Sequence, residues 1–200
     1  MNDKINSVAV LGAGTMGAGI AALAADQGCK VLLLDINDEA ASKGKNAMTA
    51  DRNPLLKDLS KIENVKIGNF NDNFSDINQY DWICEVVVER LDIKRQIFEN
   101  IEKYRKDGSV VSSNTSGIPL RDITENMSDR LLKDVCITHF FNPVKIMKLC
   151  EVIPGEKTLE VNLNKLKVFI SDILGKGVVN AKDTVNFIGN RIGCYWMLKG

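Results

Sequence analysis

Three glycines, Gly12, Gly14 and Gly17, restrict the fold of this chain more than any other feature. The segment VAVLGAGTMGAGIA places them directly after a β-branched apolar run and at the start of a helix-like segment. There the first glycine permits a tight turn, the second lets a phosphate approach the backbone, and the third allows close packing of helix on strand. Free N–H groups of the first helical turn can then hold a pyrophosphate. The spacing predicts a dinucleotide-binding turn at Gly12, Ala13, Gly14, Thr15, Met16 and Gly17.

Asp35 lies at the end of the next β-like run, where an acid can bind the hydroxyls of an adenosine ribose. Its charge would repel a 2′-phosphate, and the following INDEA contains no arginine that could receive one. The pattern therefore favours NAD over NADP as the cofactor. A methyltransferase that binds S-adenosylmethionine also uses a glycine-rich turn and a strand-end acid, and it remains an alternative at this point.

Short β-branched runs alternate with longer helix-like segments along the chain. This alternation is typical of a mainly parallel sheet covered on both faces, so we predict an α/β, Rossmann-like, doubly wound fold. The predicted strands are residues 7–12, 30–35, 64–68, 81–89, 109–113 and 134–140, with further strands at 148–154 and 177–181. The predicted helices are residues 15–27, 39–50, 94–104, 119–126 and 159–174, and the polar stretch 51–76 is predicted to be a surface excursion with a helical pair.

The composition excludes several classes of protein. Lysine plus arginine equals aspartate plus glutamate at 26 each, so no global charge attracts nucleic acid. No apolar run approaches the roughly 18 residues of a membrane-spanning helix. The five cysteines are scattered without a C-x-x-C pair, which predicts buried, reduced thiols in the cytoplasm and no metal site.

The only histidine, His139, ends a predicted strand, where ligands of open α/β sheets collect. A base that removes the proton of an alcohol needs a pKa near the working pH, and histidine meets that need. Glu151 follows twelve residues later, and Asn142-Pro143 favours a turn that would bring the two together. In isolation, a histidine in an apolar run also fits a purely structural role. The hydroxyls and amide of SSNTS, residues 112–116, fit either a substrate-oxygen site or a helix cap.

The final segment, NFIGNRIGCYWMLKG, predicts an apolar helix that needs a partner surface. We therefore expect the chain to be part of a longer polypeptide. The expected division is a dinucleotide-binding domain at residues 1–185 and the first helix of a truncated C-terminal helical domain at residues 186–200.

Five motifs together resemble the NAD-binding domain of the L-3-hydroxyacyl-CoA dehydrogenases. They are GAGTMGAGIA, EVVVERLDIKRQIF, SSNTSGI, THFFNPVKIMKLCEVIPG and KDTVNFIGNRI. The resemblance implies NAD-dependent oxidation of (S)-3-hydroxyacyl-CoA to 3-ketoacyl-CoA in fatty-acid β-oxidation. It also implies an acyl-CoA substrate and a homodimer formed through a helical domain. Without that domain, the chain would be an NAD-binding module with little turnover, which is the second hypothesis.

The resemblance also implies roles for individual residues. His139 matches the catalytic base and Glu151 the acid paired with it. Ser113 and Asn190 match residues at the substrate's C3 oxygen. The remaining matches are Glu89 and Lys94 at the cofactor, with Lys94 also near CoA, and Asn142 near the nicotinamide. The sequence departs from the family at Arg90, where many members have asparagine, and at DTVN, residues 183–186, which replaces Asp-Thr-Pro-Gly.

Overall fold

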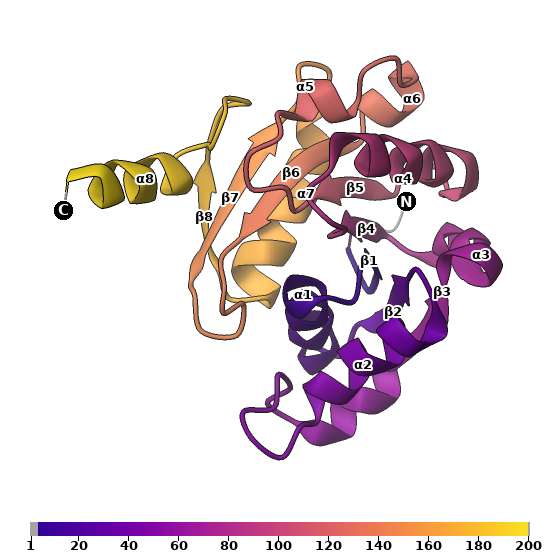
Figure 1. Cartoon of the computed structure of the whole chain (residues 1–200). Helices are drawn as coiled ribbons and strands as arrows, with labels where there is room; N and C mark the ends of the chain where they lie inside the picture. The colour runs from indigo at the N-terminus through magenta and orange to yellow at the C-terminus, as the bar shows by residue number, and fades with distance from the viewer. Residues whose placement is uncertain (1–3, 200) are drawn as a thin grey trace.

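The structure is a computed structural model that describes residues 4–199. Its centre is one eight-stranded sheet with the order β3-β2-β1-β4-β5-β6-β7-β8 (Figure 1). The first six strands are parallel, β7 is antiparallel to β6, and β8 is parallel to β7. This confirms the predicted doubly wound, mainly parallel sheet. The strands are β1 (Ser7–Leu11), β2 (Lys30–Asp35), β3 (Val65–Asn69), β4 (Trp82–Glu85), β5 (Val110–Ser113), β6 (Val135–Phe140), β7 (Leu149–Pro154) and β8 (Gly177–Asn180).

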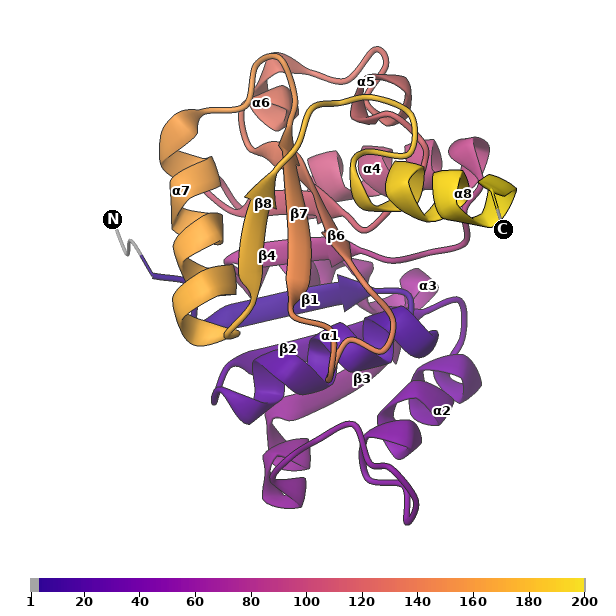
Figure 2. The ribbon, with the colours of Figure 1, turned by 90° about the vertical axis from the view of Figure 1, so that its left-hand side faces the viewer.

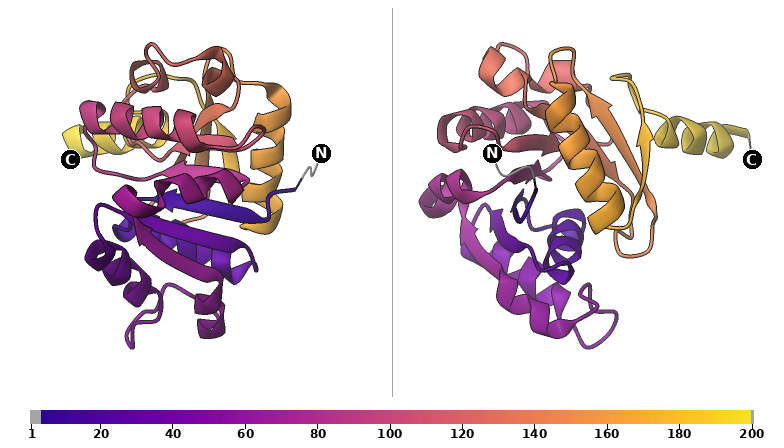
Figure 3. Two further views of the ribbon diagram at one scale, coloured as in Figure 1. Left: turned by 90° about the vertical axis from the view of Figure 1, so that its right-hand side faces the viewer. Right: turned by 180° about the vertical axis from the view of Figure 1, so that it is seen from behind.

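Helices cover both faces of the sheet (Figures 2 and 3). Alternate residues of β1 point to opposite faces, as a strand requires. Val10 packs with Ile20 of α1 in one core cluster, and Leu11 packs with Phe98 of α4 in the other. The helices are α1 (Thr15–Asp26), α2 (Asp38–Met48), α3 (Phe70–Asn73), α4 (Leu91–Tyr104), α5 (Leu120–Ile123), α6 (Asp129–Leu132), α7 (Glu160–Val168) and α8 (Gly189–Lys199).

The fourth predicted strand, residues 81–89, is longer than the strand that forms. β4 ends at Glu85 because its carboxylate turns back and accepts the N–H of Val87 at 2.7 Å. The chain then runs as a loop, and α4 begins at Leu91 rather than at residue 94. Beyond the sheet, the backbone of Val86 and Val87 lies against Gly12 of the glycine turn, whereas Val88 is exposed.

The helix predicted at 119–126 is only one turn, α5, and α6 was not predicted. Asn126 adopts a φ of 64°, a left-handed conformation that a helix cannot continue through. The polar stretch 51–76 contains a loop, a 3₁₀-helix (Leu59–Asn64), β3 and α3. Asp58 and Asn69 start the two helical turns by accepting backbone N–H groups, a local signal that hydrophobic periodicity does not contain.

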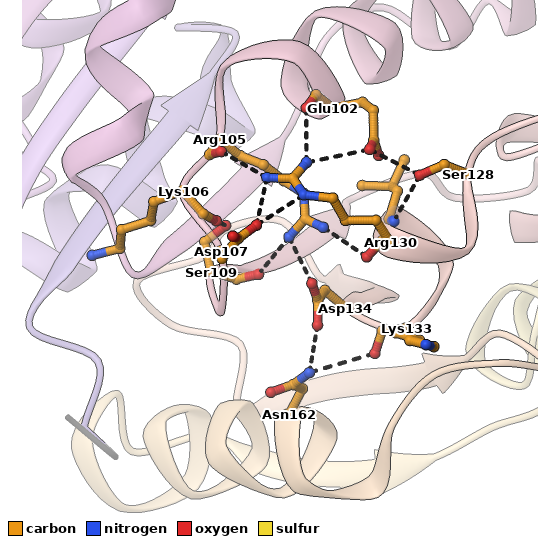
Figure 4. A network of polar contacts seen from close by, with 11 residues as sticks. Glu102, Arg105, Lys106, Asp107, Ser109, Ser128, Arg130, Lys133, Asp134 and Asn162 are labelled. Carbon is orange, nitrogen blue, oxygen red and sulfur yellow. Dashed lines mark hydrogen bonds and ion pairs between the residues drawn. The ribbon is translucent and has the colours of Figure 1, made fainter. Parts of the chain in front are cut away.

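A buried arginine joins the N-terminal ends of the strands that carry the polar motifs (Figure 4). Arg105, at the end of α4, donates to the Asp134 carboxylate at 2.7 Å, to Ser109 O at 3.2 Å and to Arg130 O at 2.7 Å. These bonds connect α4, the start of β5, α6 and the start of β6. β5 and β6 are thereby held in fixed register at the edge opposite the glycine turn.

The last helix, α8, extends away from the sheet (Figures 1 and 3). None of its described residues is buried, and its exposed apolar side chains are Ile192, Tyr195, Trp196, Met197 and Leu198. None of the helices formed by residues 4–199 has both the length and the apolar character that crossing a membrane requires.

Candidate functional site

The glycine turn leaves no room for side chains at two of its three glycines. Gly12 has a φ of +112°, and a Cβ there would lie 2.5 Å from Val86 O. A Cβ at Gly17 would lie 1.8 Å from Gly12 O. A Cβ at Gly14 would have no atom within 4 Å. The turn is therefore closed toward the protein at Gly12 and Gly17 and open outward at Gly14.

The outward side of the turn fits a dinucleotide. α1 begins at Thr15 with no side-chain cap and no acid in its first turn, so N–H groups there are left for an anion. The Asp35 carboxylate accepts the N–H groups of Ala13 and Ile36, each at 2.6 Å, and so stands beside the turn with acceptor capacity left for ribose hydroxyls. A cavity of about 370 Å³ adjoins it, lined in part by Gly14, Thr15, Asp35 and Lys43.

His139 and Glu151 form the pair that the twelve-residue spacing suggested. The two residues stand opposite each other in the antiparallel β6–β7 register. Nδ1 of His139 lies 2.7 Å from Oε2 of Glu151, and the two side chains are 4% and 1% exposed. Nε2 of His139 has no hydrogen-bond partner among residues 4–199, and it is not fully enclosed. The pair therefore leaves one ring nitrogen of His139 without a bond to the described chain.

Two phenylalanines enclose the imidazole. The ring of Phe141 lies 4.4 Å from that of His139, and the ring of Phe187 lies 5.7 Å from it, centroid to centroid. Asn186 and Phe187 have φ values of 63° and 43°. Asparagine tolerates the left-handed region well, so Asn186 can supply the bend before α8 without a glycine.

The other oxygen of Glu151 holds the start of α8. Oε1 accepts the N–H of Ile188 at 2.9 Å and that of Gly189 at 2.8 Å. The Asn190 amide donates to Ser116 O at 2.8 Å. The first turn of α8 therefore joins β7 to the loop that follows β5. It brings Asn190 and Ser116 together near the imidazole pair.

Ser113 lies in the interior of the protein. It is fully buried, its hydroxyl donates to Glu85 Oε2 at 2.5 Å, and it accepts the N–H of Thr115. Ser116, three residues further, is exposed. Within SSNTS, Ser116 is thus the residue classed as exposed, while residues 112–115 are buried. Residue types alone could not separate these serines, because both lie at the end of the same strand.

Lys94 is buried between two acids instead of reaching outward. Its Nζ lies 2.8 Å from Glu85 Oε1 and 3.3 Å from Glu89 Oε2, and its side chain is 1% exposed. Burial raises the pKa of the Glu85 carboxyl above its usual value, and Lys94 and the hydrogen bonds of Ser113 and Val87 only partly oppose this. Sequence reasoning missed Glu85, although a carboxylate inside the apolar run WICEVVV was a signal that it has a buried partner.

Glu89 fixes the loop that carries Ser116. Its Oε1 accepts the Thr115 hydroxyl at 2.5 Å and the N–H groups of Ser116 and Gly117 at 2.9 and 3.2 Å. Burial would raise the pKa of Glu89, but the Thr115 hydroxyl and the Lys94 ammonium outweigh it and hold the pKa below its usual value. Asn142 is exposed just after β6.

Comparison with known proteins gives a consistent result. Residues 7–184 match the family described as 3-hydroxyacyl-CoA dehydrogenase, NAD binding domain. The chain is 42% identical to a probable 3-hydroxyacyl-CoA dehydrogenase of Bacillus subtilis, covering 99% of this chain and 28% of that protein. It is 37% identical to a putative fatty acid oxidation complex trifunctional enzyme of Rickettsia prowazekii, over 98% of this chain and 28% of the relative.

The fold is also found among solved structures. The (S)-3-hydroxybutyryl-CoA dehydrogenase PaaH1 from Ralstonia eutropha superposes with a TM-score of 0.84 at 28% identity, over 98% of this chain and 70% of that one. The chain thus spans less than a third of the two curated relatives and most of this shorter structure.

Proposed function

Because the chain belongs to the family of 3-hydroxyacyl-CoA dehydrogenase NAD-binding domains, we propose that it takes part in the NAD-dependent oxidation of (S)-3-hydroxyacyl-CoA to 3-ketoacyl-CoA. The observation that carries the proposal is the buried His139–Glu151 pair, with one ring nitrogen free, on the same sheet as a turn suited to a dinucleotide.

His139 acts as the base in this proposal. Glu151 Oε2 accepts the proton of Nδ1, so the lone pair of the imidazole is on Nε2, the nitrogen that is free. Nε2 takes the proton of the substrate's hydroxyl, and the carboxylate stabilises the imidazolium that forms. NAD, when bound, supplies the acceptor for the C3 hydride.

The substrate's C3 oxygen needs donors beside His139. The family resemblance assigns this task to Ser113 and Asn190. Support for Asn190 comes from its place in the first turn of α8, next to the Gly189 that bonds to Glu151. Ser116 is favoured over Ser113 because Ser116 is an exposed residue and Ser113 is fully buried. In this proposal Ser113 does not contact the substrate; its hydroxyl donates to Glu85 and accepts the N–H of Thr115, and so holds the loop after β5.

The cofactor is held mainly by the backbone. The turn formed by Gly12, Ala13, Gly14, Thr15, Met16 and Gly17 surrounds the pyrophosphate, and Asp35 binds the adenosine ribose. The N–H groups of Gly12 and Ala13 bond to Leu34 O and to Asp35, so the N–H groups at the start of α1 are the ones that bind the phosphates. Glu89 and Asn142 are proposed to lie near the nicotinamide half. Lys94 is proposed to act through Glu89, since its own ammonium is enclosed by two carboxylates.

The test measures reduction of acetoacetyl-CoA by NADH alongside NADH binding by fluorescence. His139→Gln is expected to lower kcat by about 10²- to 10⁴-fold and to leave the Kd for NADH within about threefold, because the imidazole contacts no phosphate-binding group. Turnover at the parental rate by this variant would remove His139 from the mechanism.

An NAD-binding module without turnover is the second candidate. It is favoured by α8, whose described residues are all unburied, and by the relatives' greater length. NADH binding without detectable turnover by the chain alone would support it. The methyltransferase alternative has no support, because the family is one of dehydrogenases.

We further propose a place in fatty-acid β-oxidation, since a relative is named a fatty acid oxidation complex enzyme. A homodimer is proposed from the uncovered apolar face of α8. We also propose a domain boundary near residue 185, and the end of the family match at residue 184 supports it. A cytoplasmic location is proposed because all five cysteines are free thiols.

A further inference from the structure

Lys176, in the turn before β8, is a buried cation without an acid. The residue is 6% exposed, and no carboxylate among residues 4–199 forms an ion pair with it. Its Nζ donates instead to two backbone carbonyls, Val144 O and Met147 O, the latter at 2.7 Å. Lysine is rarely buried without a charged partner, so this arrangement needs a reason.

The surrounding charges do not provide that reason. Burial lowers the pKa of Lys176, and Lys148 and, to a smaller extent, Lys57 lower it further, while Cys150 opposes them. Two other lysines therefore make the site less favourable for an ammonium. The stabilising contribution must come from the carbonyl groups that Lys176 binds.

Both carbonyls belong to the β6–β7 loop, residues 141–148. Elsewhere this loop is attached to three other parts of the fold. Val144 packs against α1 so closely that a Cβ at Gly19 would lie 2.9 Å from Val144 Cβ. Lys145 Nζ donates to Pro54 O at 2.7 Å, and Gly177 N donates to Lys148 O at 2.7 Å. Figure 2 shows the loop lying along α1.

The first residues of the same loop belong to the site. The Phe141 ring lies 4.4 Å from the His139 ring. Phe141 also packs on the start of α8, where a Cβ at Gly189 would lie 2.6 Å from Phe141 Cζ. Asn142 follows directly. A shift of the loop would therefore move the side of the imidazole pocket and the residue proposed to lie beside the nicotinamide.

We propose that Lys176 is a positioning residue, whose ammonium fixes the β6–β7 loop from behind and so sets Phe141 against His139. This role rests on the proposed function for its kinetic consequence, but not for its structural one. Lys176 contacts no group of the site itself. It acts only through the carbonyls of Val144 and Met147.

The main test compares Lys176→Met with Lys148→Met, which removes an exposed lysine of the same loop. NMR can observe the site directly, because the chain has a single histidine and every imidazole ¹H–¹⁵N signal therefore comes from His139. Lys176→Met is expected to shift or broaden the His139 signals and to lower kcat about 10- to 100-fold, with the substrate KM changed less than about threefold. Lys148→Met is expected to change none of these.

A third variant separates positioning from general loss of stability. Ile101→Val weakens the core on the α4 face, remote from the loop, and is expected to leave the His139 signals unchanged. If Lys176→Met fails to fold, hydrogen exchange in the parent decides the question. The N–H groups of Ile146 and Met147, which bond to Pro143 O, should be strongly protected, and rapid exchange there would overturn the proposal.

The outcomes distinguish this inference from the proposed function. An active parent together with a Lys176→Met variant of parental kcat and unchanged His139 signals would refute the positioning role alone. An inactive parent would refute the proposed function in this chain and would leave the NMR and exchange measurements to decide the role of Lys176.

Discussion

The ammonium of Lys94 lies 2.8 Å from Oε1 of Glu85, and neither side chain is more than 1% exposed. Two opposite charges removed from water in this way are each costly to bury, and each depends on the other. The Glu85 carboxylate also receives Ser113 and the N–H of Val87, so it joins the end of β4 to the end of β5. The pair therefore fixes the ends of β4 and β5 relative to each other and to α4.

Lys94→Met should strongly destabilise the protein, because it leaves the Glu85 carboxylate buried without its cation. We expect the free energy of unfolding to fall by about 3–5 kcal/mol, measured by urea denaturation. Lys103→Met, on the same helix but exposed, is the control and should change it by less than about 0.5 kcal/mol. Equal effects of the two variants would contradict the ion pair.

The raised pKa of Glu85 predicts a pH dependence of stability. Above the ordinary glutamate value of 4.5, the folded state holds this proton more tightly than the unfolded state does. Unfolding then releases a proton, so this group's contribution to stability falls as the pH rises from that value toward the folded-state pKa. Urea melts at several pH values should show the parent losing stability relative to Glu85→Gln across that window. A constant difference would mean that the carboxyl is not perturbed.

Glu151→Gln should damage the base without disturbing the fold. The amide oxygen can still accept the N–H groups of Ile188 and Gly189, but the amide nitrogen then donates to Nδ1 of His139. The proton of the ring moves to Nε2, which can no longer act as a base. We expect kcat to fall by about 10²- to 10⁴-fold, and ¹⁵N shifts of the single histidine should report the change of tautomer. An unchanged tautomer with an unchanged rate would exclude the proposed orientation.

Two alanine substitutions in the glycine turn should separate NADH binding from stability: one should weaken binding and the other should lower the free energy of unfolding. Gly14 has a φ of −65° and open space around its Cβ position. Gly14→Ala should therefore leave the free energy of unfolding unchanged or raise it by up to about 1 kcal/mol. It should weaken NADH binding by about tenfold or more, because the methyl group occupies the place of a phosphate. Gly17→Ala should lower stability instead, since its Cβ meets Gly12 O. Calorimetry and NADH titration together separate the two, and tight NADH binding by Gly14→Ala would place the cofactor elsewhere.

Ser113→Ala and Ser116→Ala should likewise differ. Removing the Ser113 hydroxyl leaves Glu85 Oε2 short of a donor and should cost about 1–3 kcal/mol of unfolding free energy. Removing the exposed Ser116 hydroxyl should change stability by less than about 0.5 kcal/mol and should lower kcat. If kcat stays at the parental value in Ser116→Ala and falls only in Ser113→Ala, Ser113 is the serine that binds the substrate's C3 oxygen.

The parts of the fold that could be predicted are those with a local cause. The β-branched runs, the turn around Gly12 and the strand-end position of Asp35 each depend on neighbouring residues. The His139–Glu151 pair was also predictable, because a hairpin brings residues twelve apart into register. Boundaries such as the end of β4 at Glu85 were not, since a side chain that turns back on its own backbone interrupts an apolar run without changing its pattern.

The contacts that decide which serine is accessible could not be predicted from the sequence. Ser113 and Glu85 are 28 residues apart, and Asn190 and Ser116 are 74 apart. Such pairs depend on how β4, β5 and α8 come together, and each serine has the same chemistry until they do. Lys176 is a similar case, because its partners are backbone carbonyls that any residue could supply.

The first turn of α8 is bonded to Glu151 on one side and to Ser116 on the other, while none of the described residues in its later turns is buried. Within the described chain, the hydrogen bonds that attach α8 to the sheet and its loops are thus all at its first turn. A displacement of α8 would therefore strain its two bonds to Glu151, whose other oxygen bonds to His139, and its bond to the Ser116 carbonyl. A surface that packs on α8 would therefore bear on the position of the Glu151 carboxylate beside His139.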